Sequence, residues 1–357
     1  MNQSSQRTFF LGANTQDGFY SLYREFAAEP NDFLHIIKAG PGTGKSTFMR
    51  RIAQTAHERG YDVEYILCSG DPDSLDGIFI PALQMGWVDG TAPHAIDPRF
   101  FGASGAYVDL GQFCNIGALR SRREQIEKTT KHYKAYYTQA YGFLRAAGAV
   151  NGIKSPDLVT ADIAAAVEKR AKAAARREFG SRHGTTSGKA VMRFISALTC
   201  QGQVALTETV LSLCPRMIVL ENQCGLAEIF LHTILEIGLE SGANAIVCPD
   251  PLCPEQTEAV LFPTQGVGFL AAAKRWNSLP SERTIHLDTL PNRDTFRACR
   301  SEMRETEKMQ ESLLERSARA LQKAKELHDQ LEHIYRPWLD TAALDSFTGQ
   351  TINRWLN

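Results

Sequence analysis

The stretch Leu34-His-Ile-Ile-Lys-Ala-Gly-Pro-Gly-Thr-Gly-Lys-Ser-Thr47 decides the fold of this 357-residue chain. Its apolar beginning, residues 34–37, predicts a short buried strand, and Lys45 opens an amphipathic helix. A loop with three glycines joins the strand to the helix. Strand, glycine-rich loop and helix in this order are the context in which a Walker A pattern binds phosphate, so the stretch predicts a phosphate-binding loop.

The residues of this loop and of the helix start that are expected to bind a nucleotide are Gly40, Pro41, Gly42, Thr43, Gly44, Lys45, Ser46 and Thr47. Backbone N–H groups of the loop would surround the phosphate oxygens, and the helix N-terminus adds its positive dipole. We expect Lys45 to contact the outer phosphates in catalysis and the Ser46 hydroxyl to hold Mg²⁺. Ala39 replaces the first glycine of the pattern. No Asn-Lys-x-Asp guanine motif occurs, so the expected cofactors are ATP and Mg²⁺.

A second candidate is Asp89, which ends the apolar run before Gly90. A carboxylate on a stiff strand beside the Mg²⁺ ion is what a Walker B site requires, so we expect Asp89 to be both a metal ligand and a catalytic residue. The alternative is a simple Asp-Gly turn at a strand end. Because Gly90 stands where strong ATPases often carry a glutamate, we expect slow turnover or a base supplied elsewhere.

The loop between Cys68 and Gly77 contains Asp71 and Asp73, two further catalytic candidates, and also Asp76. Such a loop is expected at the carboxyl edge of the sheet, beside the phosphates. There a carboxylate could orient an attacking water or accept a proton from a substrate hydroxyl. A polar turn with Asx capping is the equal alternative.

The chain also contains ordered internal matches, which predict a duplication. Phe10 matches Phe194, Gly18 matches Gly202, and each copy continues with a strand, a helix and a second strand. The second copy has Glu221-Asn-Gln-Cys-Gly-Leu-Ala-Glu228 in place of the phosphate loop, with one glycine, no lysine and no hydroxyl. Ala271 stands in place of Asp89. We expect this copy to keep the fold and to have lost nucleotide binding.

Apolar residues recur at helical spacing after each copy, from Leu119 to Leu144 and from Leu314 to Trp338. These helical arms are expected to pack against each other or against a partner, which makes self-association or a protein partner possible. The expected segments are an active P-loop domain at 1–114, a helical arm and linker helix at 115–180, a degenerate P-loop-like domain at 190–292, and a C-terminal helical arm at 293–357. The alanine-rich stretch 161–179 predicts a helix, and the Gly/Ser/Thr-rich stretch 180–188 after it is the expected linker.

Composition excludes several other classes of protein. The net charge is −1, 43% of the residues are hydrophobic, and no apolar run reaches the ~18 residues of a membrane span. The N-terminus lacks the apolar core of a secretion signal, and the eight cysteines form no Cys-x-x-Cys pair. We therefore expect a cytoplasmic protein without a membrane partner. The basic helix 169–177 is expected to be a solvated face, with nucleic-acid contact as the lesser alternative.

Several motifs together resemble an uncharacterised bacterial family of tandem P-loop ATPases. They are Phe10–Thr15, Gly18–Ser21, the Walker A loop, Ser74–Gly77 and Val88–His94. The resemblance covers essentially the whole chain, and it implies an ATP-binding fold with Lys45, Ser46 and Asp89 at the matching positions. It implies no substrate, and the lost lysine of the second loop argues against two active sites.

The overall prediction is an α/β P-loop NTPase with a three-layer α/β/α arrangement and a mostly parallel sheet, internally duplicated, with long helical arms. The expected function is ATP binding with slow Mg²⁺-dependent hydrolysis at one site in the N-terminal copy. The alternatives are a small-molecule phosphotransferase (a kinase) and a non-catalytic ATP-dependent switch that presents its arms to a partner.

Overall fold

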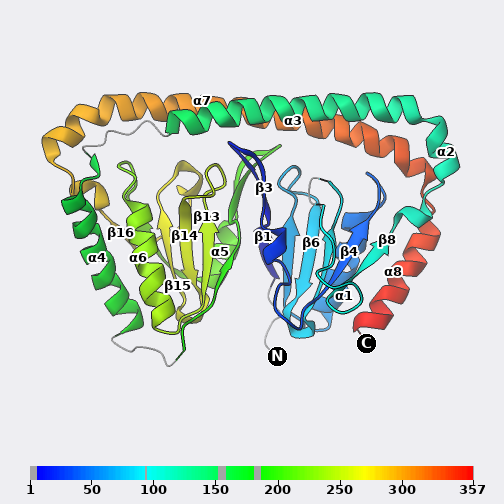
Figure 1. Cartoon of the computed structure of the whole chain (residues 1–357), viewed down its shortest axis with the longest axis horizontal. Coiled ribbons are helices and arrows are strands. Elements are labelled where there is room, and N and C mark those ends of the chain that lie inside the picture. The colour runs from blue at the N-terminus through cyan, green and yellow to red at the C-terminus, as the bar shows by residue number, and fades with distance from the viewer. Residues whose placement is uncertain (1–5, 93–94, 152–157, 181–185, 357) are drawn as a thin grey trace.

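The computed structural model describes residues 6–92, 95–151, 158–180 and 186–356, and it is an α/β structure built around two six-stranded sheets. The sheets stand side by side, and a pair of long helices runs across the top of both (Figure 1). We call the part around the first sheet the N-terminal half and the part around the second sheet the C-terminal half.

The N-terminal sheet has the strand order β1-β5-β6-β7-β4-β8. Its strands are β1 (Gln6–Phe10), β4 (Phe33–Lys38), β5 (Val63–Leu67), β6 (Leu75–Ile80), β7 (Met85–Asp89) and β8 (Gly105–Asp109). β4 runs parallel to β7 and β8, and β1 runs parallel to β5, whereas β6 is antiparallel to both of its neighbours. The sheet is therefore mixed, with parallel pairs in the majority.

The predicted strand and helix on either side of the glycine-rich loop are confirmed. β4 leads into the loop, and helix α1 (Lys45–Glu58) begins at the lysine. Neighbouring residues of a strand point to opposite faces of the sheet, and β4 uses this alternation. Ile37 packs with the buried face of α1, while Ile36 points into a core on the other side of the sheet.

The C-terminal sheet has the order β16-β12-β15-β14-β13-β9. Its strands are β9 (Ala190–Met192), β12 (Arg216–Leu220), β13 (Ala245–Pro249), β14 (Thr257–Phe262), β15 (Val267–Ala271) and β16 (Arg283–Ile285). Read from β9, this is the strand order of the N-terminal sheet, and helix α6 (Ala227–Glu240) follows β12 as α1 follows β4.

Two small hairpins join the halves. They are β2 (Gly12–Thr15) with β3 (Gly18–Ser21), and β10 (Ser196–Thr199) with β11 (Gly202–Ala205). Just before them, Phe10 and Phe194 exchange two backbone hydrogen bonds of 3.0 Å each. These are the two residues that the sequence comparison had matched, so matched positions of the two halves lie against each other.

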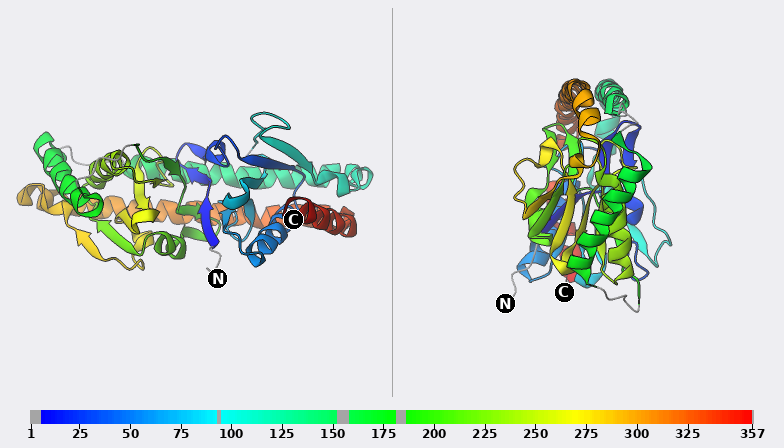
Figure 2. Two further views of the ribbon diagram at one scale, coloured as in Figure 1. Left: turned by 90° about the horizontal axis from the view of Figure 1, so that it is seen from below. Right: turned by 90° about the vertical axis from the view of Figure 1, so that its left-hand side faces the viewer.

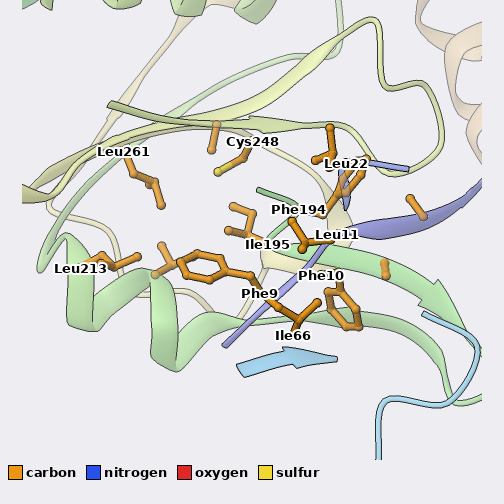
Figure 3. Packing of buried hydrophobic residues seen from close by; sticks show 14 of the residues in the cluster. Phe9, Phe10, Leu11, Leu22, Ile66, Phe194, Ile195, Leu213, Cys248 and Leu261 are labelled. Carbon is orange, nitrogen blue, oxygen red and sulfur yellow. The ribbon is translucent and has the colours of Figure 1, made fainter. Parts of the chain in front are cut away.

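One hydrophobic core fills the space between the sheets. Phe9, Phe10 and Ile66 from the N-terminal half meet Phe194 and Leu261 from the C-terminal half (Figure 3). The short helix α5 (Thr207–Leu213) adds Leu213 to this core. The expected three-layer arrangement is therefore modified, because the inner face of each sheet packs toward the other half instead of carrying a full helical layer of its own.

The helical arms are α2 (Ile116–Ser121), α3 (Arg123–Asn151), α4 (Ala161–Phe179), α7 (Arg293–Tyr335) and α8 (Thr341–Leu356). α3 and α7 lie side by side over both sheets (Figures 1 and 2). Leu144 of α3 and Leu321 of α7 share an apolar cluster, and the Ser317 hydroxyl donates to the Ala140 carbonyl at 3.1 Å. Of the two alternatives expected for the arms, packing against each other is the one observed.

Each arm follows one half in the sequence, but its last helix packs on the other half. α4 follows the N-terminal sheet but packs on α6, whereas α8 follows the C-terminal sheet but packs on α1. The bounds of α4 agree with the helix expected from the alanine-rich sequence. Most of the expected linker after it, residues 181–185, lies outside the described residues. No helix in the described part of the chain is long and apolar enough to cross a membrane.

Candidate functional site

The glycine-rich loop turns sharply between β4 and α1, and its glycines allow this path. Gly42 has a φ of 66° and Gly44 a φ of 82°, a left-handed backbone that residues with a side chain rarely adopt. Thr43 is buried, and its hydroxyl donates to the Gly40 carbonyl at 2.8 Å. The loop is thus closed by its own hydrogen bond, with Pro41 half-buried within it.

Lys45 reaches back over the loop instead of pointing into solvent. Its Nζ donates to the Gly40 carbonyl at 2.8 Å and lies 3.6 Å from Asp89 Oδ2. Both side chains are mostly buried, with 14% and 11% of their surfaces exposed. The structure therefore brings together the two residues that the sequence had predicted as the phosphate contact and the metal ligand.

Asp89 owes its position to the sheet. It ends β7, which pairs with β4 directly beside the loop. Its Oδ1 accepts hydrogen bonds from the Thr91 backbone N–H at 2.9 Å and from the Thr91 hydroxyl at 2.7 Å. The Asp-Gly turn considered as an alternative is thus also present, while Oδ2 remains directed toward Lys45.

The donor set fits Mg²⁺, which prefers oxygen ligands and keeps several of its waters. Ser46 Oγ accepts the Leu75 backbone N–H at 3.0 Å, which leaves a second lone pair on this oxygen. Thr47 is exposed on the first turn of α1. Among the residues that the structure describes, no cluster of three or more His, Cys, Asp or Glu side chains could hold a metal by itself. A metal here would use Ser46, Asp89 and oxygens of the nucleotide.

Asp71 and Asp73 lie near this site, but protein groups already bind them. Asp71 accepts from the Ser74 hydroxyl at 2.8 Å, and Asp73 accepts from the Gln201 side chain at 2.9 Å. Asp76 is buried and accepts from the Tyr23 hydroxyl at 2.9 Å. The polar-turn interpretation of this loop describes these contacts well.

Residues that sequence reasoning missed come from the far end of the chain. A Cβ on Gly42 would lie 2.9 Å from the Glu332 carbonyl oxygen of α7, and one on Gly40 would lie 3.0 Å from the Tyr335 ring. A Cβ on Gly44 would lie 3.0 Å from Leu344 of α8. The end of α7 and the start of α8 therefore cover the loop. No local pattern could have revealed contacts between residues so far apart in sequence.

The same turns of α7 bring charged side chains to the site. Lys325 Nζ lies 3.5 Å from Asp71 and 2.6 Å from Asp329. His328 Nδ1 lies 3.7 Å from Glu332 Oε1. Burial lowers the pKa of His328, and the nearby positive charges of Lys45 and Lys325 act in the same direction against the carboxylates around it.

The corresponding loop of the C-terminal half, residues 221–226, contacts a carboxylate where the N-terminal loop contacts a lysine. The Gln223 and Cys224 backbone N–H groups each donate to the Asp288 carboxylate at 3.0 Å. Glu228 accepts the Thr257 backbone N–H at 2.6 Å. A carboxylate of the chain itself thus holds two amide groups of this loop.

Comparisons with models of known protein families, with curated proteins and with solved structures found no match to this chain. The resemblance to tandem P-loop ATPases therefore stays a prediction. Two residues of its last motif, Pro93 and His94, lie outside the described residues.

Proposed function

We propose that this protein is a duplicated P-loop NTPase that binds Mg·ATP at one site in its N-terminal half and hydrolyses it slowly. The observation that carries the proposal is the placement of Lys45. Its ammonium group lies over a glycine-rich loop at the start of α1 and 3.6 Å from Asp89, at the carboxyl ends of two adjacent parallel strands. Ligands of α/β sheets bind at this edge.

The chemistry of such a site is mainly electrostatic. Backbone N–H groups of the loop and the α1 dipole would hold the β-phosphate, and Lys45 would neutralise charge on the outer phosphates. When bound, Mg²⁺ supplies further neutralisation of the triphosphate, held through Ser46 and Asp89. Gly90 provides no carboxylate to activate water beside Asp89, which supports slow turnover.

A single site is supported by the differences between the halves. The C-terminal half has Ala227 and Ala271 at the positions of Lys45 and Asp89, and Asp288 holds two amide groups of its loop. The matched strand order of the two sheets supports the duplication itself.

The test combines binding stoichiometry with turnover. Calorimetric titration of the full chain with ATP and Mg²⁺ should give one equivalent bound per chain, and ADP should appear slowly from the protein alone. Binding of two equivalents would contradict the single-site proposal. Absence of any ATP binding would overturn the nucleotide site as a whole.

A second candidate is an ATP-dependent switch, and the contact of the arms with the loop favours it. Because Gly40, Gly42 and Gly44 touch α7 and α8, a nucleotide in the loop would act directly on the arms. A switch predicts that ATP protects α3 and α7 from protease with no ADP release. The partners already bound by Asp71 and Asp73 do not favour a phosphotransferase.

A further inference from the structure

The C-terminal half contains a cavity of about 530 Å³ at the edge of its sheet, beneath α7. Its lining begins where strands end, with Glu221 after β12, Asp250 after β13 and Ala272 after β15. The volume falls in the range of ~300–1,000 Å³ that small-molecule sites occupy. The edge is also where α/β sheets bind ligands, so both size and place are those of a binding site.

The charges that line the cavity divide into paired and unpaired groups. Arg275 is buried and forms ion pairs with both Glu258 and Asp250. Lys274 forms an ion pair with Glu311 at 2.6 Å. Asp288 holds the loop amides described above. The other two acidic residues of the lining are Glu221, 2.8 Å from His286, and Glu307, 3.9 Å from Lys274. All the acidic residues of the lining therefore have protein partners.

Two basic residues of the lining, Arg300 and Arg304 of α7, differ from the rest. Neither makes an ion pair or a side-chain hydrogen bond with any residue in the described part of the chain. They stand four residues apart on one helix, a spacing at which like charges face each other and repel. An anion placed between them would relieve this repulsion, and guanidinium groups bind phosphate and carboxylate through paired N–H donors.

We propose that this cavity binds a small polar metabolite whose oxyanion, a phosphate or a carboxylate, is held by Arg300 and Arg304. The Asn222, Gln223 and Asn277 side chains also line the cavity and offer amide donors and acceptors to the rest of such a ligand. The oxyanion contacts α7 and not the loop amides, because Asp288 already occupies these. The site is thus different in chemistry from the nucleotide site of the other half.

The test uses the full chain carrying Lys45→Ala, so that binding of phosphate compounds at the N-terminal loop is strongly weakened. Glucose 6-phosphate and citrate are the anionic probes, and glucose is the neutral control, each titrated by calorimetry. We expect at least one anion to bind and glucose not to bind. Which of the two binds distinguishes a phosphate from a carboxylate ligand.

Variants then locate the binding. Arg300→Ala combined with Arg304→Ala should weaken the bound anion at least tenfold, while Arg297→Ala, on the same helix but outside the lining, should not. Arg300→Lys combined with Arg304→Lys keeps the charges and should show an intermediate loss. Both arginines are exposed, so the melting temperature of each variant should match that of its parent. The proposal is overturned if neither anion binds, or if the double alanine variant binds it as tightly as its parent.

Discussion

The loops that follow β4 and β12 occupy matching places in the two sheets but differ in backbone and contacts, because Gly42 and Gly44 are both left-handed in the first and only Gly225 is left-handed in the second. Each connects a parallel strand to a 14-residue helix. Ser46 on α1 accepts the backbone N–H of Leu75 at the start of β6, and Glu228 on α6 accepts the N–H of Thr257 at the start of β14. One structural hydrogen bond is therefore kept, although the side chain that accepts it has changed.

The two loops differ in whether a carboxylate of the chain accepts hydrogen bonds from their backbone N–H groups. Asp288, in the turn after β16, accepts two N–H groups of the C-terminal loop, whereas Asp109, at the end of β8, accepts the N–H of its neighbour Gly111 at 2.8 Å. A buried amide without a partner costs ~1–3 kcal/mol, so an acceptor for the amide of the buried residue Cys224 stabilises this loop. The comparison teaches that the same place in two similar sheets can hold either a glycine-rich loop beneath a lysine or a loop whose amides are held by a carboxylate of the chain.

The largest expected effect comes from removing the ammonium group that only the N-terminal loop has. Lys45→Ala should weaken ATP binding by ~300-fold, about 3.4 kcal/mol, because in the proposed site the lysine would make charged hydrogen bonds to the outer phosphates. Calorimetry measures the affinity, and Lys131→Ala on the exposed surface of α3 is the control. An unchanged affinity in Lys45→Ala would refute the site.

The second-largest expected effect comes from Asp89, whose position in the C-terminal half is taken by Ala271. Asp89→Asn should lower the rate of ADP release by ~50-fold in the presence of Mg²⁺, since a ligand of the metal loses its charge. ATP binding in EDTA should change little, and this is the matched control. If the loss were the same with and without Mg²⁺, Asp89 would act through Lys45 and not through the metal.

A third difference is a buried histidine. His35 on β4 stacks on Trp87 with ring centroids 4.7 Å apart, and burial lowers its pKa from 6.5 to about 4. Between these pH values the unfolded chain binds a proton that the folded chain does not, so stability falls as the pH falls through this window. We expect His35 to lower the free energy of unfolding by ~2 kcal/mol when the pH falls from 7.5 to 5.

The C-terminal half carries buried, apolar Ile218 where β12 pairs with Phe269, as β4 pairs His35 with Trp87, so an uncharged apolar residue is the informative variant. His35→Met should remove this part of the pH dependence in urea unfolding, whereas His132→Met, at an exposed position on α3, should leave it. Equal pH dependence in wild type and His35→Met would show that another group is responsible.

The smallest expected effect tests the carboxylate in the C-terminal loop. Asp288→Ala should lower the unfolding free energy by ~1 kcal/mol, because two loop amides lose their acceptor. Asp109→Ala, which removes one exposed contact, should cost less. Neither variant should bind a second ATP, since lysine and hydroxyl are both missing from the C-terminal loop. A second bound equivalent in Asp288→Ala would mean that the carboxylate alone had closed that site.

The sequence by itself determined the local elements around the candidate site. An apolar run, three glycines and an amphipathic segment led to β4, the loop and α1, and the apolar run before Asp89 led to β7. Such elements depend on periodicity and on backbone freedom at glycine, both of which are properties of neighbouring residues. The helix at 161–179 and the mutual packing of the arms were predicted for the same reason.

Only the tertiary structure decided which elements the apolar faces of the helices and sheets pack against. An apolar stripe says that a helix is buried but not against which element, so the exchange of α4 and α8 between the halves and the shared core of the two sheets could not be inferred. The approach of Glu332 to Gly42 and of Asp288 to the C-terminal loop likewise joins residues far apart in the chain. These contacts form because the whole chain must bury its apolar faces together, and no short stretch of sequence contains that information.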